Sequence, residues 1–218
     1  MRLRFLDLPD NERRLYIEQA AIQRDVSAVI VEKDFWVSWL LGILFTSKFA
    51  ESLVFKGGTS LSKVFGVIDR FSEDIDLSLS PEFLQLPIAG QSRNQANKWM
   101  AKAEAACAAA VRDRIRPALE QAVTEVLGNA PGSWFEFVTD EATHSPVLFF
   151  HYPSSQPKGF AYLKRSVKLE FGSLTDQQPI GRHAIQPLIA EILPEEFAVL
   201  TAFQSGGAGR PNLVALVG

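Results

Sequence analysis

The segment from Phe35 to Phe45 is the most apolar stretch of the chain and constrains the fold most. Its aromatic and aliphatic side chains recur at three- and four-residue spacing, which predicts a largely buried helix from Ser27 to about Lys48. A serine interrupts the run, and the run is too short to span a lipid bilayer. We therefore expect the helix to lie inside a globular protein, and 218 residues are enough for such a core.

Shorter patterns place helices and strands around this segment. Apolar spacing predicts further helices over 10–24, 59–66 and 92–127, and Pro117 should kink or split the last one. Strands are expected over 52–55, 75–79, 134–138, 147–151 and 162–171. The fold class is therefore α/β (α+β), with a mixed sheet flanked by helices. We expect one domain over 1–202 and a glycine-rich, disordered tail over 203–218.

Charge and cysteine content limit the ligands and the cellular compartment that we expect for the protein. A net charge of −3 and a pI of about 5.7 argue against nucleic-acid binding by bulk positive charge, so any RNA contact needs a local patch or a metal ion. Cys107 is the single cysteine, and we expect a core residue. The N-terminus has no signal-peptide pattern, so we expect a cytoplasmic protein. The histidines are too widely spaced for a zinc motif.

The segment VFKGGTSLSKVF runs from an expected strand through two glycines into an expected helix. Glycines let the backbone approach a ligand closely, and a helix N-terminus offers unpaired N–H groups. Hydroxyl and ammonium groups follow, so the segment could hold a triphosphate, although its spacing is not that of a Walker loop. Taken alone, the segment favours a purely structural turn, because a Gly-Gly turn between a strand and a helix is common. The candidate nucleotide-binding residues are Lys56, Gly57, Gly58, Thr59, Ser60, Lys63 and Arg70.

The segment RFSEDIDLSL carries two acids one residue apart on an expected strand. Asp74 and Asp76 should point to the same face, about 7 Å apart, while Ile75 and Leu77 point into the core. Carboxylates so close repel each other unless a cation intervenes, and Mg²⁺ prefers such oxygen ligands. The pair therefore indicates a magnesium platform, with Mn²⁺ as a substitute, or a solvated strand face.

The segment SVKLEFGS offers a third acid. Lys168 and Glu170 share one face of an expected strand, opposite its apolar side chains. Glu170 could bind metal or accept a proton from an attacking hydroxyl, and Lys168 could steady phosphate charge. Alone, this is also the pattern of any amphipathic strand.

Together, these segments resemble a known family. Their order is that of the nucleotidyltransferase fold shared with DNA polymerase beta, and KGGTSLSK followed by RFSEDIDL is similar to the AbiEii/AbiGii toxin family of nucleotidyltransferases. VEKDFW and VKLEFG also match, so the resemblance covers about Val31 to Gly172. It implies a phosphate-binding turn, a serine–acid–acid motif and a third motif. The implied catalytic residues are Ser72, Asp74, Asp76, Lys168 and Glu170, with Asp74, Asp76 and Glu170 as metal ligands.

The resemblance also implies an activity and partners. Family members act as toxins in bacterial toxin–antitoxin and phage-defence systems, and some transfer a nucleotide from a nucleoside triphosphate to the 3′ end of tRNA. We therefore expect a triphosphate substrate, an RNA or protein hydroxyl as acceptor, a cognate antitoxin and no membrane partner. One departure is that the family's Arg-Asp motif is missing after Gly172, so we expect a truncated C-terminal helical region. A catalytically inactive nucleotide-binding module and a metal-dependent phosphodiesterase or nuclease therefore remain as alternatives.

Overall fold

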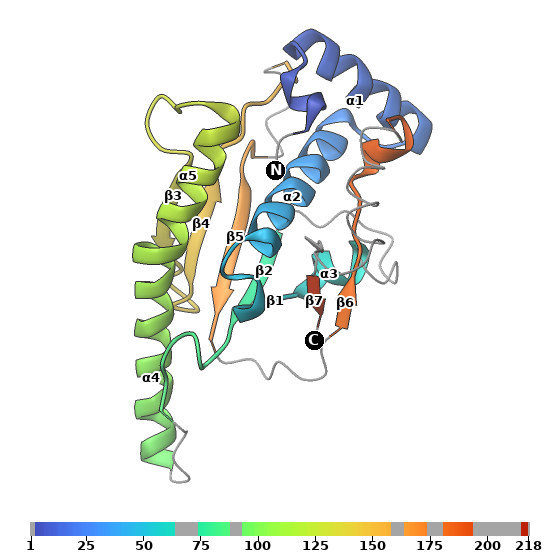
Figure 1. Cartoon of the computed structure of the whole chain (residues 1–218). Coiled ribbons are helices and arrows are strands. Elements are labelled where there is room, and N and C mark those ends of the chain that lie inside the picture. The colour runs from blue at the N-terminus through green and yellow to red at the C-terminus, as the bar shows by residue number, and fades with distance from the viewer. Residues whose placement is uncertain are drawn as a thin grey trace, which may run out of the picture.

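A five-stranded mixed sheet forms the centre of the protein (Figure 1). The computed structural model describes residues 3–63, 74–87, 93–157, 164–173, 181–193 and 215–217. The strand order is β1-β2-β5-β4-β3, with β2 and β5 parallel and the other neighbours antiparallel. The strands are β1 (Leu53–Lys56), β2 (Asp74–Leu79), β3 (Phe135–Thr139), β4 (Pro146–Phe150) and β5 (Val167–Gly172).

The helices were largely predictable from their apolar spacing. They are α1 (Asp10–Arg24), α2 (Ala28–Thr46), α3 (Gly57–Lys63), α4 (Arg93–Ala110) and α5 (Arg116–Leu127), with short 3-10 turns η1 (Arg4–Asp7), η2 (Ala50–Ser52) and η4 (Leu188–Glu191). A π-helical turn, η3 (Val111–Ile115), separates α4 from α5. Pro117 lies in the first turn of α5, where its missing N–H interrupts the preceding hydrogen-bond ladder, so the predicted split is confirmed.

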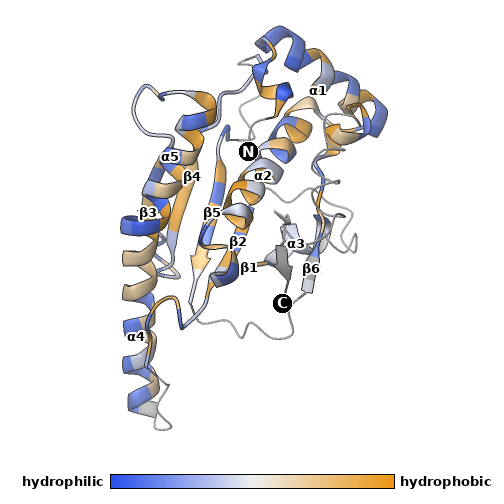
Figure 2. Cartoon of the chain, in the orientation of Figure 1, coloured by the Kyte–Doolittle hydropathy of each residue, from blue (hydrophilic) through white to orange (hydrophobic). Residues whose placement is uncertain are grey.

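The core lies between α2 and one face of the sheet. All residues of α2 from Val31 to Phe45 are buried, as the sequence predicts. The rings of Trp36 and Trp39 lie 5.8 and 6.1 Å from the ring of Phe150 in β4. Figure 2 shows β4 and parts of α2 as hydrophobic, whereas α1 carries many hydrophilic residues. Because the core occupies one face of the sheet, the polar side chains of β2 and β5 lie on the other.

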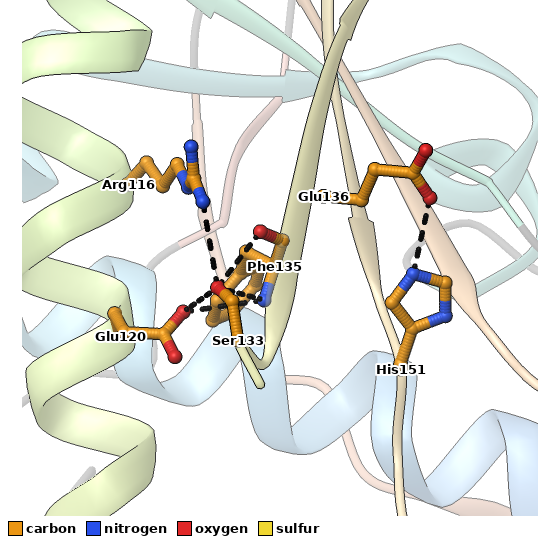
Figure 3. Close-up of polar contacts among 6 residues, drawn as sticks. All are labelled: Arg116, Glu120, Ser133, Phe135, Glu136 and His151. Carbon is orange, nitrogen blue, oxygen red and sulfur yellow. Dashed lines mark hydrogen bonds and ion pairs between the residues drawn. The ribbon is translucent and has the colours of Figure 1, made fainter. Parts of the chain in front are cut away.

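A half-buried carboxylate side chain ties α5 to the edge strand β3. Glu120 of α5 accepts hydrogen bonds from the backbone N–H groups of Trp134 and Phe135, at 2.8 and 3.2 Å. It also accepts from the Ser133 hydroxyl, and Figure 3 shows its contacts with Ser133 and Phe135. On the other face of β3, the carboxylate of Glu136 lies 3.3 Å from the imidazole of His151 (Figure 3). One side of β3 is therefore bonded to α5, whereas the pair of Glu136 and His151 on the other side is exposed.

Several element boundaries differ from expectation. The strand expected over 162–171 is observed only from Val167, and residues 158–163 lie outside the described part of the chain. The helix expected from residue 59 begins at Gly57, and its expected end near Gly66 lies outside the described residues. Of the glycine-rich tail, the structure describes only β7 (Ala215–Val217), which pairs antiparallel with β6 (Gly181–His183). The sequence did not predict this pair, because three-residue strands leave no measurable alternation.

No helix in the described part of the chain is long and apolar enough to cross a membrane. Cys107 is buried within α4, as expected for a core residue, and burial raises the pKa of its thiol to about 12.

Candidate active site

Three neighbouring strands bring the predicted acids onto one face of the sheet. In the register of the sheet, Lys56 of β1 lies opposite Asp76 of β2, and Asp76 lies opposite Glu170 of β5. One step along, Asp74 lies opposite Lys168. Directly paired residues point to the same face, so all five side chains share the face opposite the core. Acids about a hundred positions apart in the sequence thus meet as strand neighbours.

The glycine turn packs directly against one of these acids. Gly57 follows β1 with a φ of 76°, a conformation that favours glycine. A Cβ atom built on Gly57 would overlap the Oδ2 atom of Asp76. Gly57 is therefore required both for its backbone conformation and for its contact with Asp76, and any group bound at the turn would lie beside that carboxylate.

Side-chain hydroxyls hold the start of α3 in place. The Thr59 hydroxyl donates to the backbone carbonyl of Asp74, and the Ser60 hydroxyl donates to the carbonyl of Gly57 at 3.0 Å. Both residues are buried. The structure therefore gives each hydroxyl a role in fixing the turn, and their direct contact with a nucleotide stays a prediction.

Lys63, which we expected to contact phosphate, forms a buried ion pair in the structure. Its ammonium donates to the carboxylate of Asp34 in α2 and, at 2.9 Å, to the hydroxyl of Ser38. The side chains of Lys63 and Asp34 are only 8% and 4% exposed. Lys63 is thus committed to a buried ion pair between α3 and α2, and a phosphate contact for it is untested.

The acids on the sheet repel one another. The pKa of Asp76 is raised, first by burial and then by the neighbouring carboxylates of Glu170 and Asp74, while Lys56 and Lys168 oppose the shift. Glu170 accepts a hydrogen bond from Lys168 at 2.7 Å, and this bond raises the pKa of the lysine. Two ammonium groups therefore only partly compensate three carboxylates, and the face favours an additional cation.

The residues fit Mg²⁺ with two protein carboxylates more readily than with three. In the described residues, no group of three or more His, Cys, Asp or Glu side chains stands ready to hold a metal ion. Glu170 is paired with Lys168, whereas Asp74 and Asp76 lie two residues apart on the same face of β2. Mg²⁺ commonly takes one or two carboxylates and completes its shell with water and phosphate oxygens. The excess negative charge at Asp76 therefore matches that ion.

Two predicted residues cannot be placed, and one group was missed. Arg70 and Ser72 lie outside the described residues. The missed group is Asp34 and Ser38, which hold Lys63. A signal for it was present, because the run Glu32-Lys33-Asp34 puts three charges in a helix whose other residues are all uncharged. Buried charges are seldom found without partners.

Comparison with known proteins supports the resemblance that the motifs suggest. The family model described as nucleotidyl transferase AbiEii toxin, Type IV TA system, matches residues 39–202, which is most of the chain. No curated protein and no solved structure matches. The mixed sheet flanked by helices is consistent with a nucleotidyltransferase fold, and the matched region contains the glycine turn and all three acids. The chain therefore belongs to the AbiEii family, the nucleotidyltransferase toxins of type IV toxin–antitoxin systems.

Proposed function

We propose that the protein transfers a nucleoside monophosphate from a nucleoside triphosphate to a hydroxyl at an RNA 3′ end, with tRNA as the first candidate acceptor. The observation that carries the proposal is the position of Asp76. It lies between the glycine turn and Glu170, and its pKa is raised by burial and by two other acids. Such an arrangement favours a cation beside a bound phosphate. Perturbed carboxylates of this kind concentrate at functional sites.

Binding of the triphosphate is assigned to the glycine turn. Gly57, Gly58 and Thr59 begin α3, where backbone N–H groups have no partner within the helix. Lys56 of β1 adds positive charge, because it lies opposite Asp76 and its ammonium opposes the rise in the pKa of that carboxyl. Asp74 and Asp76 would hold Mg²⁺, which neutralises charge on the attacking and leaving oxygens when bound.

The proposed chemistry is an in-line displacement. The acceptor hydroxyl oxygen forms a bond to the α-phosphorus, the bond between the α-phosphorus and the bridging oxygen breaks, and pyrophosphate leaves. The hydroxyl proton passes to Glu170, whose carboxylate Lys168 holds at 2.7 Å. Ser72 is assigned to the same site by family resemblance alone, and Arg70 is proposed to help hold the phosphates. We further propose that the toxin acts in the cytoplasm, in phage defence, and is countered by a cognate antitoxin.

A specific test uses nucleoside triphosphates labelled at the α-phosphate. Purified protein is incubated with each labelled triphosphate, MgCl₂ and total tRNA, beside the D74A/D76A double variant. We expect label on RNA with the wild-type protein alone, and the productive triphosphate names the base. Label on RNA with the double variant would contradict the metal assignment, and label on protein would move the acceptor to a protein hydroxyl.

A second candidate follows from the pairing of Glu170 with Lys168, since no group of three or more acids stands ready to hold a metal ion in the described residues. In this reading the chain binds a triphosphate and does not turn it over. Calorimetric binding of a triphosphate with Mg²⁺, without label on either RNA or protein, would favour this nucleotide-binding module over the enzyme.

A further inference from the structure

We propose that Asp34 is a positioning residue for nucleotide binding, which acts through Lys63 to hold α3 and its glycine turn against Asp76. This inference rests on the proposed function and deepens it. Asp34 lies in VEKDFW, which resembles the family's pattern, but neither that resemblance nor the family match over residues 39–202 assigns it a role. The inference is based on the contacts between α2, α3 and η4.

A closed polar network joins the three elements. One oxygen of the Asp34 carboxylate accepts from the Lys63 ammonium, and the other accepts from the backbone N–H of Leu188 at 2.7 Å. The Ser38 hydroxyl accepts from Lys63 at 2.9 Å and donates to the Asp34 carbonyl at 2.9 Å. Removing one partner of such a buried pair leaves the other charge without compensation. The network therefore fixes Lys63 at one position.

Helix α3 is held at both described ends. Thr59 bonds its first turn to the Asp74 carbonyl of β2, and Lys63, its last described residue, bonds to α2. With the second anchor lost, the helix can turn about the first. Gly57 packs against Oδ2 of Asp76 without room for a methyl group, so a small rotation of α3 changes the distance between the turn and the acid. Asp34 thereby controls the geometry of the turn from a buried position.

A neighbouring residue provides a matched control. Glu32 is buried in the same turn of α2, and its carboxylate accepts from the Ser155 N–H at 2.7 Å and from the hydroxyls of Ser154 and Ser155 at 2.6 and 2.8 Å. These contacts hold the loop after β4 and do not include α3. A change at Glu32 thus disturbs a comparable buried network without a bond to the glycine turn.

The test compares Asp34→Asn, Lys63→Met, their double variant and Glu32→Gln. For each, KM for the triphosphate and kcat are measured with saturating RNA, together with the triphosphate Kd by calorimetry and Tm. We expect Asp34→Asn to raise KM and Kd at least tenfold with a smaller change in kcat, and Glu32→Gln to lower Tm while leaving KM within twofold. Because the pair acts as a unit, Lys63→Met and the double variant should match Asp34→Asn.

Three results would overturn the inference. Equal KM values for Asp34→Asn and Glu32→Gln would reduce Asp34 to a stabilising residue. A much larger loss for Lys63→Met than for Asp34→Asn would make Lys63 a phosphate ligand. Absence of triphosphate binding by the wild-type protein would overturn the proposed function, and this inference with it. If Asp34→Asn does not fold, Ser38→Ala decides the matter, because it removes one acceptor of Lys63 and should still raise KM, by about threefold.

Discussion

The protein contains two groups of acids that differ in how their negative charge is compensated. In α2, Asp34 and Glu32 are buried, and their carboxylates accept hydrogen bonds from an ammonium, from hydroxyls and from backbone N–H groups. On the sheet, Asp76 is only half-buried, yet its pKa is raised by burial and by the carboxylates of Glu170 and Asp74. The more deeply buried acids are the better compensated ones.

We interpret this difference as one between acids that stabilise the fold and acids whose charge the proposed cation would compensate. A buried carboxylate with several donors is a fixed part of the structure, since its removal leaves those donors without a partner. Acids packed against one another store repulsion that a cation relieves. We therefore expect substitutions in α2 to act on stability, and substitutions on the sheet to act on activity. Asp34 alone should act on both.

The largest effect is expected at Asp76. Asp76→Asn keeps the shape of the side chain but removes a charge that the proposed Mg²⁺ site requires, so transfer should fall by on the order of a thousandfold. The same change relieves repulsion with Glu170 and Asp74, so Tm without divalent metal should not fall. Labelled-nucleotide transfer and thermal unfolding measure the two quantities. A lower Tm would show that Asp76 stabilises the fold, as the α2 acids do.

Removal of Glu32 should have the largest effect on stability without changing the site. Glu32→Ala leaves three donors of Ser154 and Ser155 without their acceptor, and hydrogen bonds to a charged group contribute roughly 1.5–3 kcal/mol each. We expect the free energy of unfolding to fall by about 3 kcal/mol in urea titration. If triphosphate affinity fell as well, the separation between the two groups of acids would be lost.

Two glycines with positive φ test the contact at the turn. Gly57 and Gly128 have φ values of 76° and 82°, but only Gly57 lacks room for a Cβ atom, because Asp76 fills that space. Each change to alanine should cost about 1–3 kcal/mol of backbone strain. Gly57→Ala should also lower transfer at least tenfold, whereas Gly128→Ala should leave the specific activity of folded protein unchanged. Equal activities would separate the turn from the chemistry.

The raised pKa of Asp76 predicts a pH dependence of stability. An aspartate whose pKa is higher in the folded than in the unfolded protein binds its proton more tightly when folded, so it destabilises the fold at high pH and this loss is recovered as pH falls through the folded pKa. Without divalent metal, Asp76→Asn should therefore be more stable than wild type at pH 7, and the difference should shrink as pH falls toward 4. Urea titrations across this range test the sign, and saturating Mg²⁺ should reduce the difference at pH 7.

Sequence patterns predicted the sheet face well and the buried network poorly. Alternation alone placed Asp74 and Asp76 on one face and their apolar neighbours on the other, because strand geometry is local. It could not show that Glu170 lies opposite Asp76, since strand pairing joins distant parts of the chain. Lys63 was assigned to phosphate because of its charge near the glycine turn, whereas a tertiary contact with Asp34 decides where its ammonium lies.

The smallest effect is expected for a surface ion pair beside the buried network. Arg24 of α1 pairs with Glu191 of η4, the same turn whose Leu188 N–H bonds to Asp34. Both side chains are partly exposed, so water and salt screen the attraction, and such pairs contribute about 0–1 kcal/mol. Arg24→Ala should therefore lower the free energy of unfolding by less than about 1 kcal/mol and leave triphosphate affinity unchanged. A loss of affinity would mean that η4 transmits its position through Asp34 to α3, and that the positioning network extends to the surface.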